Sequence, residues 1–247
     1  MALEMGHEVH ILDNLSTGVQ SNADLVMKKG GKFHFVDIRD NQKLEQCMVD
    51  IDAVIHLAAQ VSVPLSIENP EENWDVNVNG TENVLETARK LGITRVIAAS
   101  SAAVYGKCDQ MPLKESSAGE LLSPYAESKM HNELQVAKYR KYGMQAIAFR
   151  FFNVYGPRQD SNGAYAAVIS KFISLLQQGK APTIFGDGGQ TRDFIHVRDV
   201  SEILLEAVSM DWGSNLNLVY NVATQTEISL LDLLESMYKI LEDAGIN

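Results

Sequence analysis

The sequence lacks the residues that several common kinds of site require. Only 2 cysteines, Cys47 and Cys108, occur among 247 residues, and their spacing fits neither a metal site nor a redox pair. The 6 histidines are scattered without a ligand pattern, so we expect no bound metal. Low cysteine content also favours a reducing compartment, and we expect a cytoplasmic protein.

Basic residues are in the minority, and long apolar runs are missing. The 21 Lys and Arg residues against 32 Asp and Glu residues give a formal net charge of −11, without a basic patch. This balance argues against a nucleic-acid partner. No apolar run approaches the length of a membrane span and no signal peptide is recognisable, so we expect no membrane partner either.

What the sequence does contain is an alternation of apolar runs with helical segments. One long helix is predicted over residues 70–90 and another over 124–142, where Ser123 is the N-cap and Pro124 the first helical residue. This alternation predicts an α/β fold with a parallel sheet. Buried strands are predicted at residues 8–12, 32–36, 53–59, 94–99, 145–150 and 219–223.

The stretch 101–129 carries the clearest chemical pattern. Ser101 follows the strand at 94–99, and open α/β sheets bind ligands at the carboxyl ends of their strands. Tyr125 and Lys129 are one helical turn apart and share a helix face. A cation about 4 Å away contributes about 4 kcal/mol at an effective dielectric of about 20, which lowers the pKa of a phenol. We predict that Tyr125 is a base for a sugar hydroxyl, helped by Lys129 and Ser101, although this spacing also occurs by chance.

Two segments of this stretch resemble a known family. Ser-Ala-Ala-Val-Tyr-Gly at 101–106 and Ser-Pro-Tyr-Ala-Glu-Ser-Lys at 123–129 resemble the extended short-chain dehydrogenase/reductase family, the NAD-dependent epimerases and dehydratases of nucleotide sugars. The resemblance covers essentially the whole chain and is closest to UDP-glucose and UDP-N-acetylglucosamine 4-epimerases. It implies NAD as cofactor, a UDP-hexose as substrate, and a homodimer that pairs the helices 70–90 and 124–142 with their copies.

The resemblance also implies a doubly wound parallel sheet of the Rossmann type with a smaller mixed α/β substrate region. Residues 1–156 and 190–224 are assigned to the NAD-binding domain, and 157–189 and 225–247 to the substrate region. In such folds a glycine-rich phosphate loop lies about 20 residues before the acidic residue that binds the ribose. That position falls before Met1, so we expect the chain to be a fragment at its start, and at its end as well.

Cofactor-binding residues are expected after several strands. Asp13 ends the first strand, where an acidic residue binds the ribose hydroxyls in a dinucleotide fold. The resemblance places Asp37 and Ile38 at the adenine, with the alternative that Asp37 caps a helix near Leu44. The rest of the predicted cofactor site is formed by Asn14, Leu15, Ser16, Thr17, Gly18, Leu57, Ala58, Ala59, Gln60, Val76 and Phe152.

Substrate contacts are expected mainly from the second half of the chain. Arg192 is predicted to clamp a diphosphate, because a guanidinium binds phosphate oxygens in pairs. Pairing of Arg192 with Asp193 is the alternative. A short strand is predicted at 183–185, with the ring of Phe185 packed on uracil, and a small Ala167 leaves room for a bulky sugar substituent. The full predicted set is Ser62, Asn153, Ala167, Thr183, Phe185 and Arg192.

The residues after Ser101 decide between reaction types. Dehydratases of the family carry Asp-Glu at this point and decarboxylases carry a Glu, whereas this chain has Ala102 and Ala103. Hydride transfer alone remains, and a 4-epimerase needs nothing more. We therefore predict an NAD-dependent UDP-hexose 4-epimerase. A dehydrogenase or reductase of the same family, and a non-catalytic fragment that cannot hold NAD, stay open as alternatives.

Overall fold

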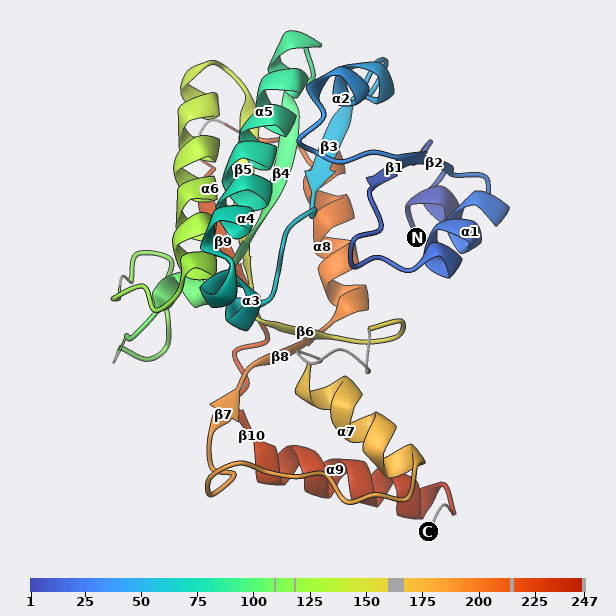
Figure 1. Ribbon diagram of the computed structural model, residues 1–247, viewed down its shortest axis with the longest axis vertical. Helices are drawn as coiled ribbons and strands as arrows, with labels where there is room; N and C mark the ends of the chain where they lie inside the picture. The colour runs from blue at the N-terminus through green and yellow to red at the C-terminus, as the bar shows by residue number, and fades with distance from the viewer. Residues whose placement is uncertain (109, 118, 160–166, 214–215, 246–247) are drawn as a thin grey trace. The chain divides into compact units, whose positions relative to one another are not determined.

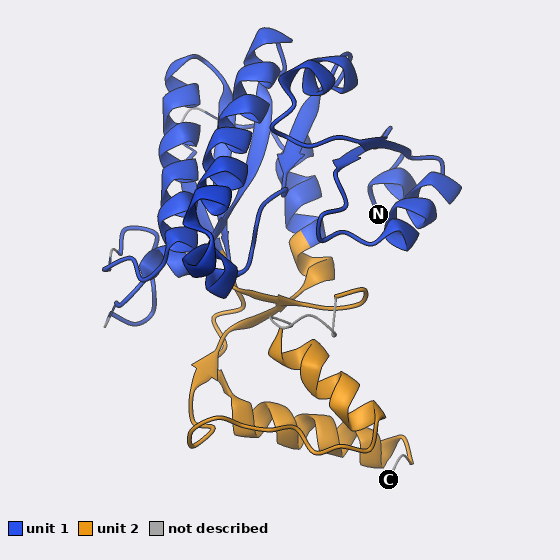
Figure 2. Cartoon of the chain, viewed as in Figure 1, with its two compact units in different colours: residues 1–151, 201–221 blue, residues 152–200, 222–247 orange. Residues whose placement is uncertain are grey.

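The computed structural model describes residues 1–108, 110–117, 119–159, 167–213 and 216–245. The chain forms two compact units, Met1–Phe151 with Ser201–Asn221, and Phe152–Val200 with Val222–Asn247 (Figure 2). In the described residues, no helix is both long and apolar enough to cross a membrane.

The first unit alternates strands with helices, as the sequence pattern predicts (Figure 1). Its strands are β1 (His10–Asp13), β2 (Lys32–Phe35), β3 (Ala53–His56), β4 (Arg95–Ser101), β5 (Gln145–Phe151) and most of β9 (Val219–Val222). Its helices are α1 (Gln20–Lys28), α2 (Asn41–Cys47), α3 (Val63–Glu68), α4 (Pro70–Trp74), α5 (Gly80–Lys90), α6 (Pro124–Lys141) and most of α8 (Val197–Ser209). Single 3-10 turns occupy Ala2–Met5 and Ala102–Tyr105.

Parallel pairing brings several strand ends to one edge of the sheet. The order is β3-β4-β5-β9, and β3, β4 and β5 are parallel, whereas β1 and β2 form a separate parallel pair. Ala98 of β4 pairs with His56 and with Ala148, and Ser101 pairs with Phe151. The segments that follow β3, β4 and β5 therefore leave the sheet on the same side, which confirms the predicted α/β fold with a parallel sheet.

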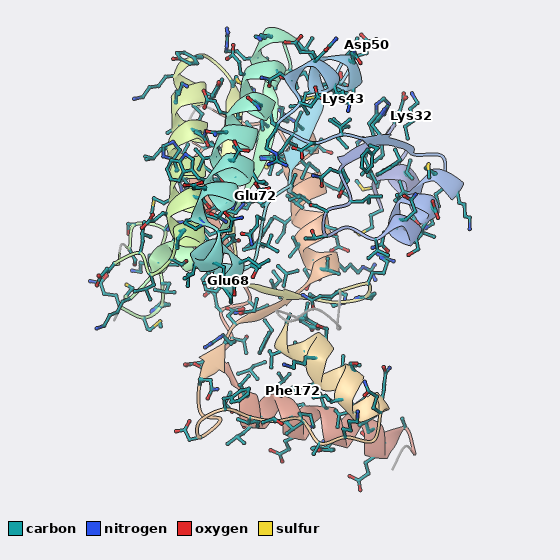
Figure 3. All side chains as sticks on the ribbon, in the orientation of Figure 1. Lys32, Lys43, Asp50, Glu68, Glu72 and Phe172 are labelled. Carbon is teal, nitrogen blue, oxygen red and sulfur yellow. The ribbon has the colours of Figure 1, made fainter. Side chains whose placement is uncertain are left out.

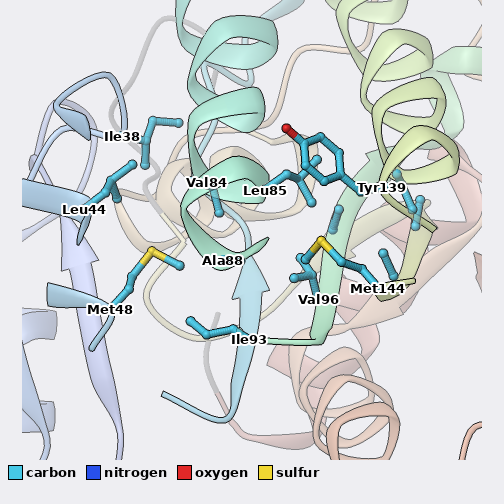
Figure 4. Close-up of a cluster of buried hydrophobic side chains, with 14 of the residues drawn as sticks. Ile38, Leu44, Met48, Val84, Leu85, Ala88, Ile93, Val96, Tyr139 and Met144 are labelled. Carbon is cyan, nitrogen blue, oxygen red and sulfur yellow. The ribbon is translucent and has the colours of Figure 1, made fainter. Parts of the chain in front are cut away.

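The main hydrophobic core fixes α5 and α6 on one face of this sheet (Figure 4). Val96 of β4, Ala146 of β5 and Val136 of α6 are fully buried, and Leu85 of α5 is 1% exposed. Burial of one large aliphatic side chain contributes about 1.5–3 kcal/mol to stability. The core thereby holds α6 rigidly against β4 and β5.

The predicted helix 70–90 is confirmed, but it contains a π-helical turn in its middle. A π-helical turn, Asp75–Asn79, separates α4 from α5. The buried Asn77 in this turn binds the backbone of Gln60, which lies after β3, through Gln60 N at 2.7 Å and Gln60 O at 3.0 Å. π turns are rare in proteins, and those that occur are often found at functional sites. The π turn therefore makes the region around Asn77 a candidate part of a functional site.

The second unit is built from shorter elements. Its strands are β6 (Asn153–Tyr155), β7 (Thr191–Arg192), β8 (Phe194–His196) and β10 (Ile228–Ser229), and its helices are α7 (Val168–Gln177) and α9 (Leu230–Asp243). β6 and β8 are parallel, and β7 and β10 are antiparallel. Phe172, labelled in Figure 3, is the most buried side chain of α7 at 4% exposure. Ser229 caps α9 by accepting from Asp232 N.

The strand predicted at residues 183–185 is wrong. These residues have no strand conformation, and the ring of Phe185 is 78% exposed. Gly186 and Gly188 follow with φ of 78° and 74°, a conformation that glycine adopts easily and other residues rarely. The segment is therefore a turn that buries no apolar side chain on a sheet.

Candidate active site

Helix α6 presents three ionisable side chains in a row on its buried face. Ser123 caps the helix by accepting from Ala126 N at 3.1 Å, and Pro124 occupies the first turn, as the sequence predicts. Tyr125, Lys129 and Glu133 follow at intervals of one turn and are 9%, 4% and 4% exposed. Three such groups on one buried helix face are unusual, because buried ionisable groups need partners.

The structure brings Ser101 and Tyr125 together. Ser101 is the last residue of β4, and its hydroxyl accepts from Ala103 N at 3.2 Å and lies near enough to the phenol of Tyr125 to lower the pKa of that phenol. Burial raises the pKa of Tyr125 above its ordinary value, and the nearby hydroxyl of Ser101 offsets part of that rise. The prediction that Lys129 lowers the pKa of Tyr125 is wrong, because burial raises that pKa. Lys129 Nζ lies 5.9 Å from the centre of the Tyr125 ring.

The ammonium of Lys129 is anchored to the sheet. Its Nζ donates to the carbonyl oxygen of Ala99 on β4 at 3.0 Å. Burial lowers the pKa of Lys129 to about 8. A group with a pKa near neutrality exchanges protons readily at physiological pH, and such shifts are frequent at active sites.

Two further buried side chains fix the start of α6. Ser66 of α3 is fully buried and accepts from Tyr125 N at 3.1 Å. Asn77 of the π turn donates to Ser128 Oγ at 3.1 Å, between Tyr125 and Lys129 in the chain. Sequence reasoning missed Ser66, because nothing in its own segment indicates a contact with residue 125.

A buried ion pair lies at the next turn of the same helix face. The carboxylate of Glu133 accepts hydrogen bonds from Nε and Nη2 of Arg150 on β5, both at 2.8 Å. It also accepts a hydrogen bond from Ser100 Oγ on β4 at 2.6 Å. Sequence reasoning missed this cluster. The available signals were an arginine inside an apolar strand and a glutamate one turn after Lys129.

The loop after β1 folds around the carboxylate of Asp13. Asp13 Oδ1 accepts from Leu15 N at 2.6 Å, and Leu15 has a φ of 53°. A Cβ on Gly18 would lie 3.1 Å from Asp13 Oδ1, so this close approach suits glycine. Ser16 and Thr17 are exposed. Asp13 is half-buried at the end of β1, and its role in binding ribose stays a prediction.

Asp37 is more fully engaged than the sequence suggests. Its two oxygens accept four hydrogen bonds, three from Arg39 and one from Asn14 Nδ2 at 2.9 Å. The guanidinium of Arg39 holds the pKa of Asp37 well below its usual range. The capping alternative is wrong, because Asp40 caps α2 by accepting from Lys43 N. Four bonds fill the ordinary capacity of a carboxylate, so an adenine contact requires one donor to leave.

The same arginine reaches α4 and the π turn. Arg39 Nη1 lies 3.1 Å from Glu72, labelled in Figure 3, and 3.2 Å from Asp75. Ile38, between Asp37 and Arg39, is buried in the core. The predicted adenine segment is thus tied by charge to the π turn.

The segment after β3 offers backbone and small side chains. Leu57 is 50% exposed, Ala58 is exposed, and Ala59 and Gln60 are half-buried. Val76 packs against the hydrophobic core. Ser62 accepts from Leu65 N at 3.2 Å and caps α3, a helix that the sequence did not predict. The hydroxyl predicted to contact a sugar therefore has a capping role.

In the second unit, the predicted residues Asn153, Ala167 and Arg192 line one pocket. Asn153 Nδ2 donates to the carbonyl oxygen of Asp193 at 2.9 Å. Arg192 is exposed, and its Nη1 donates to Thr191 O at 2.7 Å. The rest of the pocket wall is formed by Val154, Tyr155, Val168, Ile169, Phe194 and Leu230.

The remaining predictions in this unit have mixed outcomes. The carboxylate of Asp193 accepts from Thr224 N at 2.9 Å, and the structure shows no contact of Arg192 with it, so the alternative pairing is not what forms. Thr183 and Phe185 are exposed and are not among the residues that line the pocket. Phe152 is half-buried and donates its backbone N–H to Val222 O.

Comparisons with known proteins agree with this geometry. A UDP-N-acetylglucosamine 4-epimerase from Methanobrevibacter ruminantium, solved with UDP-N-acetylmuramic acid, is 38% identical and superposes with a TM-score of 0.89 over 95% of this chain and 74% of that one. A UDP-glucose 4-epimerase from Mycolicibacterium smegmatis is 36% identical over 92% of this chain and 73% of its own length. A dTDP-glucose 4,6-dehydratase, DesIV from Streptomyces venezuelae, solved with NAD, is 31% identical with a TM-score of 0.83 over 97% of this chain and 72% of that one.

Relatives of two activities thus share the fold and much of the sequence. The sequence model of the NAD dependent epimerase/dehydratase family matches residues 1–223, which confirms both the family resemblance and the cofactor expected from it. With a parallel sheet and a serine, tyrosine and lysine gathered at the end of β4, the chain belongs to the NAD dependent epimerase/dehydratase family.

Proposed function

We propose that this protein is a UDP-hexose 4-epimerase, acting on UDP-glucose and UDP-galactose or on their N-acetylated analogues. The observation that carries the proposal is the position of the Ser101 hydroxyl near the phenol of Tyr125, with the buried Lys129 Nζ 5.9 Å from the centre of the Tyr125 ring. Two of the relatives described above are 4-epimerases of UDP-sugars.

The chain offers residues that suit the two ends of NAD. Asp13 presents a carboxylate at a strand end for ribose hydroxyls, and the small Ala58 and Ala59 allow a close approach to backbone after β3. Bound NAD+ supplies the hydride acceptor and an additional positive charge. We assign the ribose contact to Asp13 and the nicotinamide side to residues 57–60.

Tyr125 is the proposed proton carrier at the sugar C4 hydroxyl. Because burial raises its pKa, the phenol is protonated at rest, and a neighbouring cation is needed before it acts as a base. Lys129, with a pKa of about 8, is such a cation below that pH. The Ser101 hydroxyl, near the phenol, is the proposed group that orients the sugar hydroxyl that exchanges the proton.

Ala102 and Ala103 favour epimerisation over dehydration. They form the 3-10 turn that directly follows Ser101, and this turn presents methyl groups where an elimination needs an acid and a base. After hydride leaves C4, the only change that these residues support is return of hydride to the ketone. Return to the opposite face inverts C4 and needs no further ionisable group.

The second unit supplies the proposed substrate contacts. Arg192, Asn153 and Ala167 share one pocket, which we assign to the nucleotide sugar, with Arg192 at the diphosphate. We also propose a homodimer formed through the outer surfaces of α4 and α6. Trp74 of α4 and Leu134 of α6 are 41% and 60% exposed, which is unusual for large apolar side chains on adjacent helices.

Product analysis tests the proposal directly. Purified protein is incubated with NAD and either UDP-glucose or UDP-N-acetylglucosamine, and the nucleotide sugars are separated by chromatography. The proposal predicts equilibration with the 4-epimer of at least one substrate and no net NADH. Accumulation of a 4-keto-6-deoxy sugar would identify a dehydratase, and net NADH without an epimer would identify a dehydrogenase.

A further inference from the structure

The ion pair below Lys129 joins the two elements that carry the proposed catalytic residues. Ser100 of β4 directly precedes Ser101, and Glu133 of α6 lies two turns after Tyr125. The 2.6 Å hydrogen bond from Ser100 Oγ to Glu133 Oε1 therefore connects the strand that ends at Ser101 with the helix whose first turn carries Tyr125. Ser100 is 3% exposed and Glu133 is 4% exposed, so water does not compete for this bond.

We propose that Glu133, held by Arg150, is a positioning residue that sets the distance between Ser101 and Tyr125. The inference rests on the proposed epimerase function and adds residues to its site. Arg150 binds both oxygens of Glu133 at 2.8 Å, which fixes the plane of the carboxylate. That plane in turn directs Oε1 at Ser100.

Arg150 is itself held from its other side. Its Nη1 donates to the carbonyl oxygen of Glu115 at 3.1 Å, and its guanidinium carbon lies 4.7 Å from the centre of the Tyr105 ring. Tyr105 closes the turn that begins after Ser101, and its hydroxyl donates to Asn221 Oδ1 at 2.6 Å. The pair thus touches the chain on both sides of Ser101, at Ser100 and at Tyr105.

Stability alone does not account for such a cluster. Removing two charges from water is expensive, and replacing a buried ion pair with apolar residues of similar volume is often neutral or stabilising. A bidentate ion pair with a third hydrogen-bond donor fixes the orientation of the carboxylate, which apolar packing does not do. Direction matters here because a misplacement of about 1 Å between reacting groups lowers a rate by about 100-fold.

Ser100→Ala is the sharpest test, because it removes one hydroxyl and leaves the ion pair in place. We expect kcat for 4-epimerisation to fall by about 10- to 100-fold while KM stays within about twofold. Tyr139→Phe is the matched control. It also removes a hydroxyl of α6 that is bonded to carboxylates, here Glu82 and Glu86 of α5, but at a position about 21 Å along α6 from Tyr125. An unchanged kcat in Ser100→Ala, with the control also unchanged, would overturn the proposal.

A double variant separates positioning from folding. In Glu133→Leu with Arg150→Met both charges disappear and the volume is nearly kept, so we expect an unfolding temperature equal to or above that of the natural protein. Its kcat should nevertheless fall at least as far as in Ser100→Ala. A double variant with full kcat would contradict the positioning role.

A readout that does not depend on turnover distinguishes this inference from the proposed function. Natural protein without 4-epimerase activity on any UDP-hexose would refute the proposed function only. In that case the ring of Tyr125, labelled with 13C, is titrated by NMR. Ser100→Ala should change its chemical shift and pKa, whereas Tyr139→Phe should leave both unchanged. An unaltered Tyr125 signal in Ser100→Ala would refute the positioning role.

Discussion

The proposed catalytic residues and the proposed substrate residues lie in opposite kinds of surroundings. Tyr125 and Lys129 are buried and bonded to groups far away in the chain, such as Ser66 and Ala99. Arg192 is exposed, and its guanidinium donates to the carbonyl oxygen of the adjacent Thr191. The fold therefore fixes the proposed proton-transfer residues through contacts between distant segments, whereas the proposed diphosphate contact, Arg192, is exposed.

This contrast predicts the largest loss of activity for Tyr125→Phe. Removal of the phenolic hydroxyl eliminates the proposed proton carrier, and general acid–base catalysis typically contributes 10²–10⁴-fold. We expect kcat to fall by about 10³-fold, as measured by initial rates of UDP-hexose interconversion. The free energy of unfolding should fall by only about 1 kcal/mol, the typical value of one hydrogen bond. Retention of more than about a tenth of the activity would break the comparison.

Lys129→Met should lose activity and gain stability. The pKa of Lys129 is about 8 in the folded protein and ordinarily 10.5, so the unfolded chain binds more protons between these values and stability rises with pH there. Below pH 8 the folded protein carries a buried cation at a cost of about 3 kcal/mol. Urea unfolding at pH 7 should show most of this gain in Lys129→Met, and the gain should shrink toward pH 10.5. An equal gain at both pH values would contradict the assignment, as would kcat reduced by less than about 10-fold.

Arg192→Gln should separate binding from turnover. A hydrogen bond to a charged group contributes about 1.5–3 kcal/mol, so we expect KM for a UDP-hexose to rise by about 10- to 100-fold. Because Arg192 is exposed, kcat and the unfolding temperature should stay close to those of the natural protein. A fall in kcat with KM unchanged would contradict the proposed substrate-binding role and would group Arg192 with the catalytic residues.

The smallest effect is expected at the pocket wall. Ala167→Leu reduces the space beside Asn153 and Arg192, and one misfit in a pocket changes discrimination by about 1–3 kcal/mol. UDP-N-acetylglucosamine should lose about 10-fold in kcat/KM relative to UDP-glucose. Equal losses for both substrates would show that Ala167 does not face the 2-substituent of the sugar.

The features predicted correctly from the sequence depend on local patterns. The apolar runs of β3, β4 and β5, the Ser123 cap and the shared helix face of Tyr125 and Lys129 all follow from residues close in the chain. The helix ends at Lys141, one residue from the predicted boundary. Local signals were therefore sufficient to place these residues on the correct elements.

The features that were missed depend on contacts between distant segments. The π turn at Asn77 is stabilised by Gln60, and the cluster at Glu133 joins β4, α6 and β5. The direction of the pKa shift at Tyr125 was wrong for the same reason. Burial is the largest cause of that shift, and burial is a property of the folded protein. Spacing along a helix shows which groups share a face, but it does not show how far that face is buried from solvent.

Fate of the C4 hydrogen is the most direct test of hydride transfer and return at one carbon. UDP-glucose carrying deuterium at C4 is incubated with the protein and NAD in ordinary water, and the product is examined by NMR and mass spectrometry. The account predicts UDP-galactose that retains deuterium at C4, with none at other carbons. Loss of deuterium to solvent, or its appearance at C6, would contradict the account.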